Sequence, residues 1–233
     1  MPLLRRLLLI AISLPISVHA ATKIEIKGEQ IDFPPPQKSK LAFFSGDPKG
    51  IYVTEYTDAK DKVDSWKTYL ISDSRYPHHM GSWLDLIAFA LGTLQEKCPT
   101  IRFSEIEPLL SNIFPGKAVA VAYYCPEKLP NAPYGEAALN FFLEGEDYNF
   151  HHWHSWRPQE KPKEEDIFGV NHFSLLTDYI VMREYLSICN PEKGKPCRYN
   201  KLYPHKNKWQ GRASDLSEDD LKRFTTQKEL FHK

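Results

Sequence analysis

The chain has little of the residue types that mark unusual protein classes. It contains 11 glycines and four cysteines among 233 residues, and its 30 basic residues are balanced by 30 acidic ones. The few glycines exclude a collagen-like chain. The balanced charge, with 42% hydrophobic residues, excludes a highly charged disordered chain. The composition therefore favours one globular domain, or one domain with a small appendage.

The short motifs that identify common enzyme classes are also absent from the sequence. It contains no HExxH zinc motif, no Gly-x-Ser-x-Gly nucleophile elbow, no P-loop and no Rossmann glycine string. It contains no Asn-x-Ser/Thr glycosylation site either, which favours a bacterial exported protein over a glycosylated eukaryotic one. No motif in the chain names a reaction.

The first 20 residues have the pattern of a secretory signal peptide. Arg5 and Arg6 form a basic start, residues 7–16 are apolar, and Val18-His19-Ala20 has the small residues of a cleavage site. The apolar part is about half of the ~20 residues needed to span a membrane, and no later segment is long enough. We therefore expect an exported protein, periplasmic or secreted, with no transmembrane segment in the mature chain.

The charge of the mature chain is close to neutral but unevenly spread. Without Arg5 and Arg6 it has 28 basic and 30 acidic residues, a balance that does not favour a nucleic-acid partner. A basic stretch from Lys193 to Arg212 contains three interleaved aromatic residues and no acidic one. Acidic residues follow from Asp215, so we interpret the basic stretch as a solvated loop.

All four cysteines lie in the mature chain, and an even count in an exported protein favours disulfides over free thiols. The segment between Cys189 and Cys197 contains two prolines and is rich in turn residues, which favours pairing these two. Cys98 then pairs with Cys125.

The hydrophobic patterns predict an α+β fold. We expect a signal peptide over 1–20, an extended lead-in over 21–50 and a single α+β globular domain over 51–233. Alternation predicts strands at 51–56, 117–125 and 148–156, and helical spacing or capping predicts helices at 58–70, 83–96, 104–115, 134–143, 174–189 and 218–231. The strand at 117–125 is apolar on both faces, so we expect it to lie centrally in a mixed sheet packed by several helices. The helix at 83–96 is apolar on most sides and is expected to be largely buried.

Three histidines in four residues are the strongest candidate for chemistry. If residues 148–156 form a strand, His152 and His154 share one face and can both bind one transition metal such as zinc. If the segment is helical, His151 and His154 are the neighbouring pair. A catalytic site needs a third ligand. The candidates for this ligand, or for its hydrogen-bond partner, are His172, His78, His79, Glu144, Glu146 and Asp147. This pattern supports a metal-dependent hydrolase, with packing among aromatic residues as the alternative.

The same segment contains candidate binding residues. Exposed tryptophans suit interfaces and ring-shaped ligands, and Arg157 adds a directed hydrogen bond beside Trp153 and Trp156. Both tryptophans are alternatively part of the core. Because no catalytic motif is complete, our leading interpretation is an effector-like exported protein that binds an unknown protein or small ligand. Its binding face would combine these three residues with the basic stretch.

The run Gly81-Ser82-Trp83, followed by Ala88-Phe89, resembles the helix that carries the nucleophile in papain-like cysteine peptidases. The family's cysteine between Ser and Trp is absent, four residues separate Trp83 from Ala88, and the resemblance covers under a tenth of the chain. No catalytic residue is carried over, and Ser82 is explained as a helix N-cap. A papain-like or serine hydrolase remains a further alternative.

Overall fold

The computed structural model describes residues 26–33, 36, 38–47, 49–104, 107–108, 117–129, 131–163 and 172–198. The predicted signal peptide, the predicted C-terminal helix and most of the basic stretch lie outside these residues. Within them, no helix is long and apolar enough to cross a membrane.

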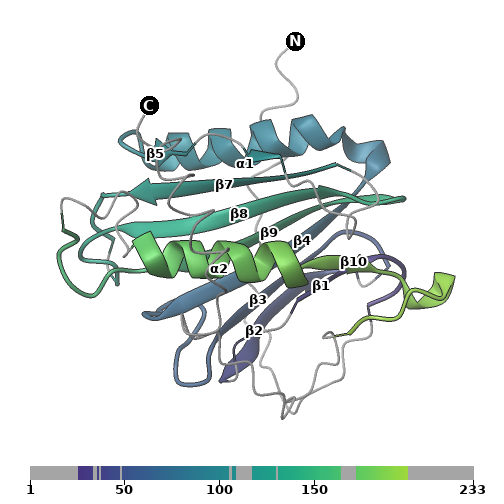
Figure 1. Ribbon diagram of the computed structural model, residues 1–233, viewed down its shortest axis with the longest axis horizontal. Coiled ribbons are helices and arrows are strands. Elements are labelled where there is room, and N and C mark those ends of the chain that lie inside the picture. The colour runs from purple at the N-terminus through teal and green to yellow at the C-terminus, as the bar shows by residue number, and fades with distance from the viewer. Residues whose placement is uncertain are drawn as a thin grey trace, which may run out of the picture.

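One antiparallel sheet forms most of the described fold (Figure 1). Its strand order is β2-β3-β4-β9-β8-β7-β5, and β6 also pairs with β7. The strands are β2 (Ser39–Gly46), β3 (Tyr52–Asp58), β4 (Tyr69–Pro77), β5 (Arg102–Phe103), β6 (Glu107–Pro108), β7 (Ala118–Cys125), β8 (Glu136–Glu144) and β9 (Tyr148–Trp156). The helices are α1 (Trp83–Lys97) and α2 (His172–Tyr185), with 3-10 turns η1 (His78–Met80) and η2 (Pro191–Lys193). A separate two-stranded sheet pairs β1 (Gln30–Asp32) with β10 (Ser187–Cys189).

The predicted α+β fold, with a mixed sheet packed by several helices, is wrong. The described residues are mostly β, all strand pairs are antiparallel, and there are two α-helices. Residues 134–143 were expected to be helical, but β8 occupies most of them and is buried from Ala137 to Leu143. A strand buried on both faces is apolar throughout, so its sequence loses the alternation that distinguishes strand from helix.

Residues 58–70 also differ from the predicted helix. They form the connection between β3 and β4, and Trp66, one of the residues at helical spacing, is a buried loop side chain. Residues 107–108 are β6 instead of the interior of a helix. In both segments tertiary contacts override a weak local preference.

Other predictions of local structure are confirmed. β9 has the predicted bounds, and all eight residues of β7 are buried, although this strand lies between β8 and two short strands near one end of the order. Helix α1 begins with a capping box. The Ser82 hydroxyl accepts a hydrogen bond from the Asp85 amide at 3.2 Å, and the Asp85 carboxylate accepts one from the Ser82 amide at 2.7 Å.

The two helices cover opposite faces of the sheet. Helix α2 packs on a continuous apolar face that includes Leu139 and Phe141, whereas α1 packs on Val119, Val121 and Phe142, which alternate with that set. In Figure 1, α2 crosses in front of the sheet and α1 runs alongside β7. Below, these are called the α2 face and the α1 face.

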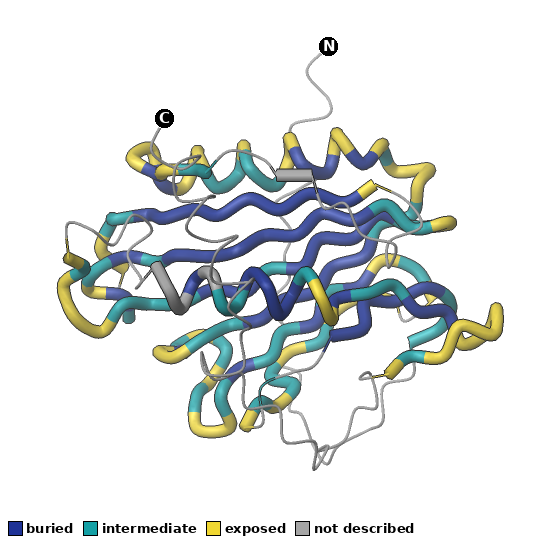
Figure 2. Tube along the Cα trace, in the orientation of Figure 1, coloured by how far each residue is buried: buried dark blue, intermediate teal, exposed yellow. Residues whose placement is uncertain are grey.

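Helix α1 is less buried than its apolar composition suggests. Its buried residues are Trp83, Leu86 and Ile87, while Leu84 is 67% and Phe89 58% exposed. The exposed outer side of the helix is visible in Figure 2. The expectation of a largely buried helix is wrong because a helix lying on one face of a sheet buries only the stripe that contacts it.

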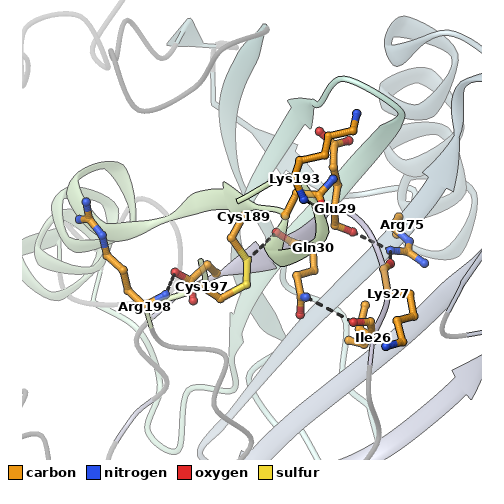
Figure 3. Close-up of a disulfide and its surroundings, with 11 residues drawn as sticks. Ile26, Lys27, Glu29, Gln30, Arg75, Cys189, Lys193, Cys197 and Arg198 are labelled. Atoms are coloured by element: carbon orange, nitrogen blue, oxygen red, sulfur yellow. Dashed lines mark hydrogen bonds between the residues drawn. A yellow bond between two sulfur atoms is a disulfide. The ribbon is translucent and has the colours of Figure 1, made fainter. Parts of the chain in front are cut away.

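Both disulfides have the favoured pairing. Cys98, at the end of α1, is bonded to Cys125 at the end of β7, and Cys189 of β10 is bonded to Cys197. Cys189 pairs with Gln30 of β1, so this bridge lies where the N-terminal strand meets the C-terminal part of the described chain (Figure 3). No cysteine is free.

A buried arginine anchors the approach to β1. Arg75 of β4 donates hydrogen bonds to the carbonyl oxygens of Lys27 and Glu29, each at 2.6 Å, and to that of Gly50 at 2.8 Å. The Glu29 carboxylate accepts the amides of Glu146 and Asp147 in the β8–β9 turn. These contacts hold the segment before β1 against the end of the large sheet.

Candidate functional site

Strand β9 distributes the predicted site residues over both faces of the sheet. The pairing of β9 with β4 places His152 beside Asp73 and His154 beside Ile71, so both histidines lie on the α2 face. The side chains of Asn149, His151, Trp153 and Ser155 lie on the α1 face. Trp153 and Trp156 are three residues apart and therefore face opposite ways. The predicted binding residues do not form one surface.

His152 is fully buried within the α2 face. Its Nδ1 lies 2.5 Å from the Asp73 carboxylate, and the rings of Phe33 and Phe141 lie 4.9 and 6.0 Å from its own. Its Nε2 has no hydrogen-bond partner among the described residues. His154 lies between the rings of Tyr69 and Trp156, and within the described chain neither of its nitrogens is paired.

The two other histidines of the cluster titrate far below neutrality. Burial, together with a smaller effect of the neighbouring His152, lowers the pKa of His154 to about 3. His151 has the same shift with the same causes, although it lies on the other face, stacked on Phe142 and hydrogen-bonded to Asn140 at 2.9 Å. His151 and His154 are therefore neutral at physiological pH, as packed core histidines are.

The predicted third metal ligands do not gather around His152 and His154. His78 and His79 are exposed in η1, and Glu146 and Asp147 form ion pairs elsewhere. The side chain of His172, at the start of α2, lies outside the described residues. Among the residues that the structure describes, no group of three or more His, Cys, Asp or Glu side chains is placed to hold a metal ion.

The described part of the basic stretch lies far from Arg157. Lys193 contacts Glu146 at 3.1 Å and Asp147 at 2.8 Å, and Lys195 contacts Glu146 at 2.5 Å. The hydrogen bonds that Lys193 donates to these carboxylates raise its pKa, and the two lysines lower the pKa of Glu146. These acidic residues precede β9, whereas Arg157 follows it, about 33 Å away along an extended strand.

Arg157 has a clear structural role. Its guanidinium lies 3.7 Å from the centre of the Trp66 ring, and it donates to the Trp66 carbonyl at 2.7 Å and to the Glu136 carboxylate at 3.1 Å. Burial raises the pKa of Glu136, and Arg157 opposes that rise. The arginine holds the β3–β4 connection against the sheet.

A row of side chains that the sequence did not connect crosses the middle of the α1 face. The strand registers place in line Phe43 of β2, Glu55 of β3, Ser72 of β4, Trp153 of β9 and Asn140 of β8, which we call the Trp153 row. Phe43 is 42% exposed, and Trp153 and Glu55 are half-buried. Ser72 and Asn140 form the buried part of the row.

Two polar groups of the Trp153 row have no partner among the residues that the structure describes. The Ser72 hydroxyl is fully buried and has no hydrogen-bond partner among the described residues. Within the described chain, no cation or hydrogen-bond donor pairs with the Glu55 carboxylate, and burial raises its pKa. Alternation predicted the strand containing Glu55, but only the pairing of four distant strands places it in line with Trp153.

No family model matches this chain, and neither does any curated protein or solved structure. The site must therefore be judged by its own chemistry. All four cysteines are in disulfides, so none is available as the nucleophile of a papain-like enzyme. The Ser82 hydroxyl donates to Asp85 at 2.6 Å within the capping box, as expected for a helix N-cap.

Proposed function

We propose that this chain is an exported, disulfide-bonded protein that binds a small ligand at the Trp153 row. The observation that carries the proposal is the buried Ser72 hydroxyl, which has no hydrogen-bond partner in the described part of the chain and lies between a half-buried tryptophan and a carboxylate with no ion-pair partner there. Buried polar groups are nearly always hydrogen-bonded, and an unsatisfied one costs about 1–3 kcal/mol. A ligand that moves the side chains over Ser72 apart and presents a polar atom to its hydroxyl recovers that energy, while the indole provides a flat apolar surface.

The composition of the row supports binding over packing. The α2 face supplies a continuous apolar core, and α1 covers a second apolar cluster at β7 and β8. The Trp153 row belongs to neither buried cluster, yet it crosses the middle of the sheet. A row that served only stability would gain more from apolar side chains at Glu55 and Ser72.

A ligand screen with a matched pair of variants tests this function. Mature protein is screened against small polar metabolites by nuclear magnetic resonance, and each hit is repeated with Trp153→Leu and with Trp156→Leu. Trp156 lies on the opposite face of the same strand and is the control. We expect Trp153→Leu to abolish binding and Trp156→Leu to preserve it. Hits that require Trp156 but not Trp153 would refute the assignment of the face.

One observation favours a metal-dependent hydrolase as a second candidate. A carboxylate that holds one histidine nitrogen while leaving the other unpaired is typical of metal-ligating histidines, and Asp73 holds His152 in this way. His154 would be the second ligand. Metal analysis of protein purified without an affinity tag tests this candidate. Absence of stoichiometric zinc, manganese, iron or copper, with stability unchanged by chelator, rejects it.

A further inference from the structure

The Trp153 row combines a carboxylate, two aromatic rings and a small residue in an order that suits one class of ligand. We infer that it binds a small organic cation, with an alkylammonium head group seated over Ser72 between Glu55 and Trp153. This inference rests on the proposed function and names the ligand class for the same site.

Ser72 is fully buried, so the head group rests above it against the partly exposed outer parts of the Glu55 and Trp153 side chains. Neighbouring strands lie about 4.8 Å apart, so the backbones of Glu55 and Trp153 are separated by about 10 Å, with Ser72 midway. The serine side chain is short, whereas those on either side are long. A cation above Ser72 lies within reach of the carboxylate and within the ~6 Å at which cation–π attraction acts.

Phe43 adds a second ring on the outer side of the carboxylate. It is directly opposite Glu55 on β2, where cross-strand side chains approach to about 5 Å, and it is 42% exposed. A carboxylate with an aromatic side chain on each side is a combination by which proteins recognise ammonium groups. The faces of the rings have a negative electrostatic potential and the carboxylate has a negative charge, so both attract a cation. The row contains these elements on three different strands.

The charge of the row excludes the main alternative ligands. An anion would be repelled by Glu55. An apolar ring would leave that carboxylate desolvated without a partner, and a neutral sugar would supply hydrogen-bond donors but no counter-charge, so a cation is favoured over both. The rise in the pKa of Glu55 is caused by burial, and a bound cation would oppose it. Because Ser72 is fully buried, its hydroxyl reaches an N–H or O–H group of the ligand only when the side chains of Glu55 and Trp153 move apart.

A matched pair of probes separates charge from shape. Mature protein is titrated by nuclear magnetic resonance with choline and with 3,3-dimethyl-1-butanol, in which carbon replaces the charged nitrogen. We expect choline to shift signals of the Trp153 indole and of residues near Ser72, and the neutral alcohol to bind at least about tenfold more weakly. Glu55→Gln should weaken choline binding about tenfold, and Trp153→Leu should abolish it.

Two further variants serve as controls that separate a loss of binding from a loss of folding. Trp153→Phe keeps an aromatic ring and should retain part of the affinity, and Trp156→Leu should bind like the unmodified protein. All variants are first checked for cooperative unfolding. Equal binding of the two probes, or choline binding unchanged by Glu55→Gln, overturns the cation assignment while a ligand site at Trp153 stands. If about 10 mM choline causes no chemical-shift changes in the protein, the cation assignment is also overturned, because this concentration corresponds to the weakest affinity of interest. The metabolite screen then decides separately whether the row binds anything.

Discussion

The two faces of the large sheet differ although the same strands build both. The α2 face is a largely apolar layer that encloses the polar side chains of Asp73, His152 and His154, and α2 and the N-terminal segment close it. The α1 face is apolar where α1 covers it and polar along the Trp153 row. Adjacent residues such as Phe141 and Asn140 belong to these different environments. The comparison indicates that the polar side chains of the α2 face are enclosed in its core, whereas Glu55 and Trp153 on the α1 face remain partly exposed.

The largest expected effect is the loss of a core ring from the α2 face. Phe141 is fully buried and stacks on Tyr179 of α2, so Phe141→Ala should lower the free energy of unfolding by about 3–5 kcal/mol. Trp153→Leu, at a half-buried position on the α1 face, should cost about 1 kcal/mol. Urea denaturation followed by circular dichroism measures both. Equal losses would contradict the division of roles between the faces.

The second-largest effect should come from the Cys189–Cys197 disulfide, which lies at β10 beside the α2 face. Replacing Cys189 and Cys197 with serine should lower stability by about 2–3 kcal/mol, because the cross-link restricts the unfolded chain. Since β10 is the strand that pairs with β1, amide exchange in β1 should accelerate. The matched control replaces Cys98 and Cys125, which should leave β1 protected. Faster exchange of β1 in the control variant alone would refute this local role.

Acidification should lower the free energy of unfolding, because each face of the sheet contains one buried histidine that becomes protonated more easily in the unfolded chain. The folded-state pKa of His151 and of His154 is about 3, below the ordinary value of about 6.5, so the unfolded state takes up more protons between these limits. Their stabilisation is complete above pH ~6.5 and falls as the pH drops, by at most about 1.4 kcal/mol per pH unit for each. Measuring unfolding free energy from pH 7.5 to 4.5 tests this sign.

Asp178 opposes that trend and provides a control. Burial raises its pKa to about 7, so its contribution to stability is present at low pH and lost as the pH rises from about 4 to 7. Asp178→Asn removes this opposing term and should make the loss of stability on acidification steeper. Greater stability at pH 5 than at pH 7 in the Asn variant would contradict the histidine assignment.

The smallest effect should come from the charge in the Trp153 row. Burial disfavours the ionised Glu55, so Glu55→Gln should raise stability at pH 7, by roughly a few tenths of a kcal/mol because solvent still screens the half-buried group. The gain should vanish near pH 4, where the carboxyl is protonated in both states. A clear loss of stability at pH 7 would mean that Glu55 serves the fold.

Local signals predicted some elements closely and failed at others for an identifiable reason. β9 alternates in character and α1 begins at a Ser82 capping box, and both were located from sequence. β8 is apolar at nearly every position, so helix and strand could not be separated by periodicity. Trp66 has helical spacing by coincidence, and its position depends on a distant contact with Arg157.

The candidate site was only partly accessible from sequence. The histidine and tryptophan cluster was visible as a run, and alternation on a strand separates His152 from Trp153. Ser72 and Glu55 carry no local signal, because their importance arises from strand register with Trp153. Register is set by hydrogen bonds between segments that are far apart in the chain.

The sequence by itself determined the local features. Its apolar and aromatic runs located β7 and β9, and the capping residue Ser82 located the start of α1. The even number of cysteines and the turn residues between Cys189 and Cys197 indicated the two disulfides. Only the tertiary structure decided that β3, β4 and β9 are neighbours, and therefore that Glu55, Ser72 and Trp153 lie in one row. The physical reason is that side-chain alternation is a property of each strand, whereas the pairing of strands is selected by burial of the whole apolar face.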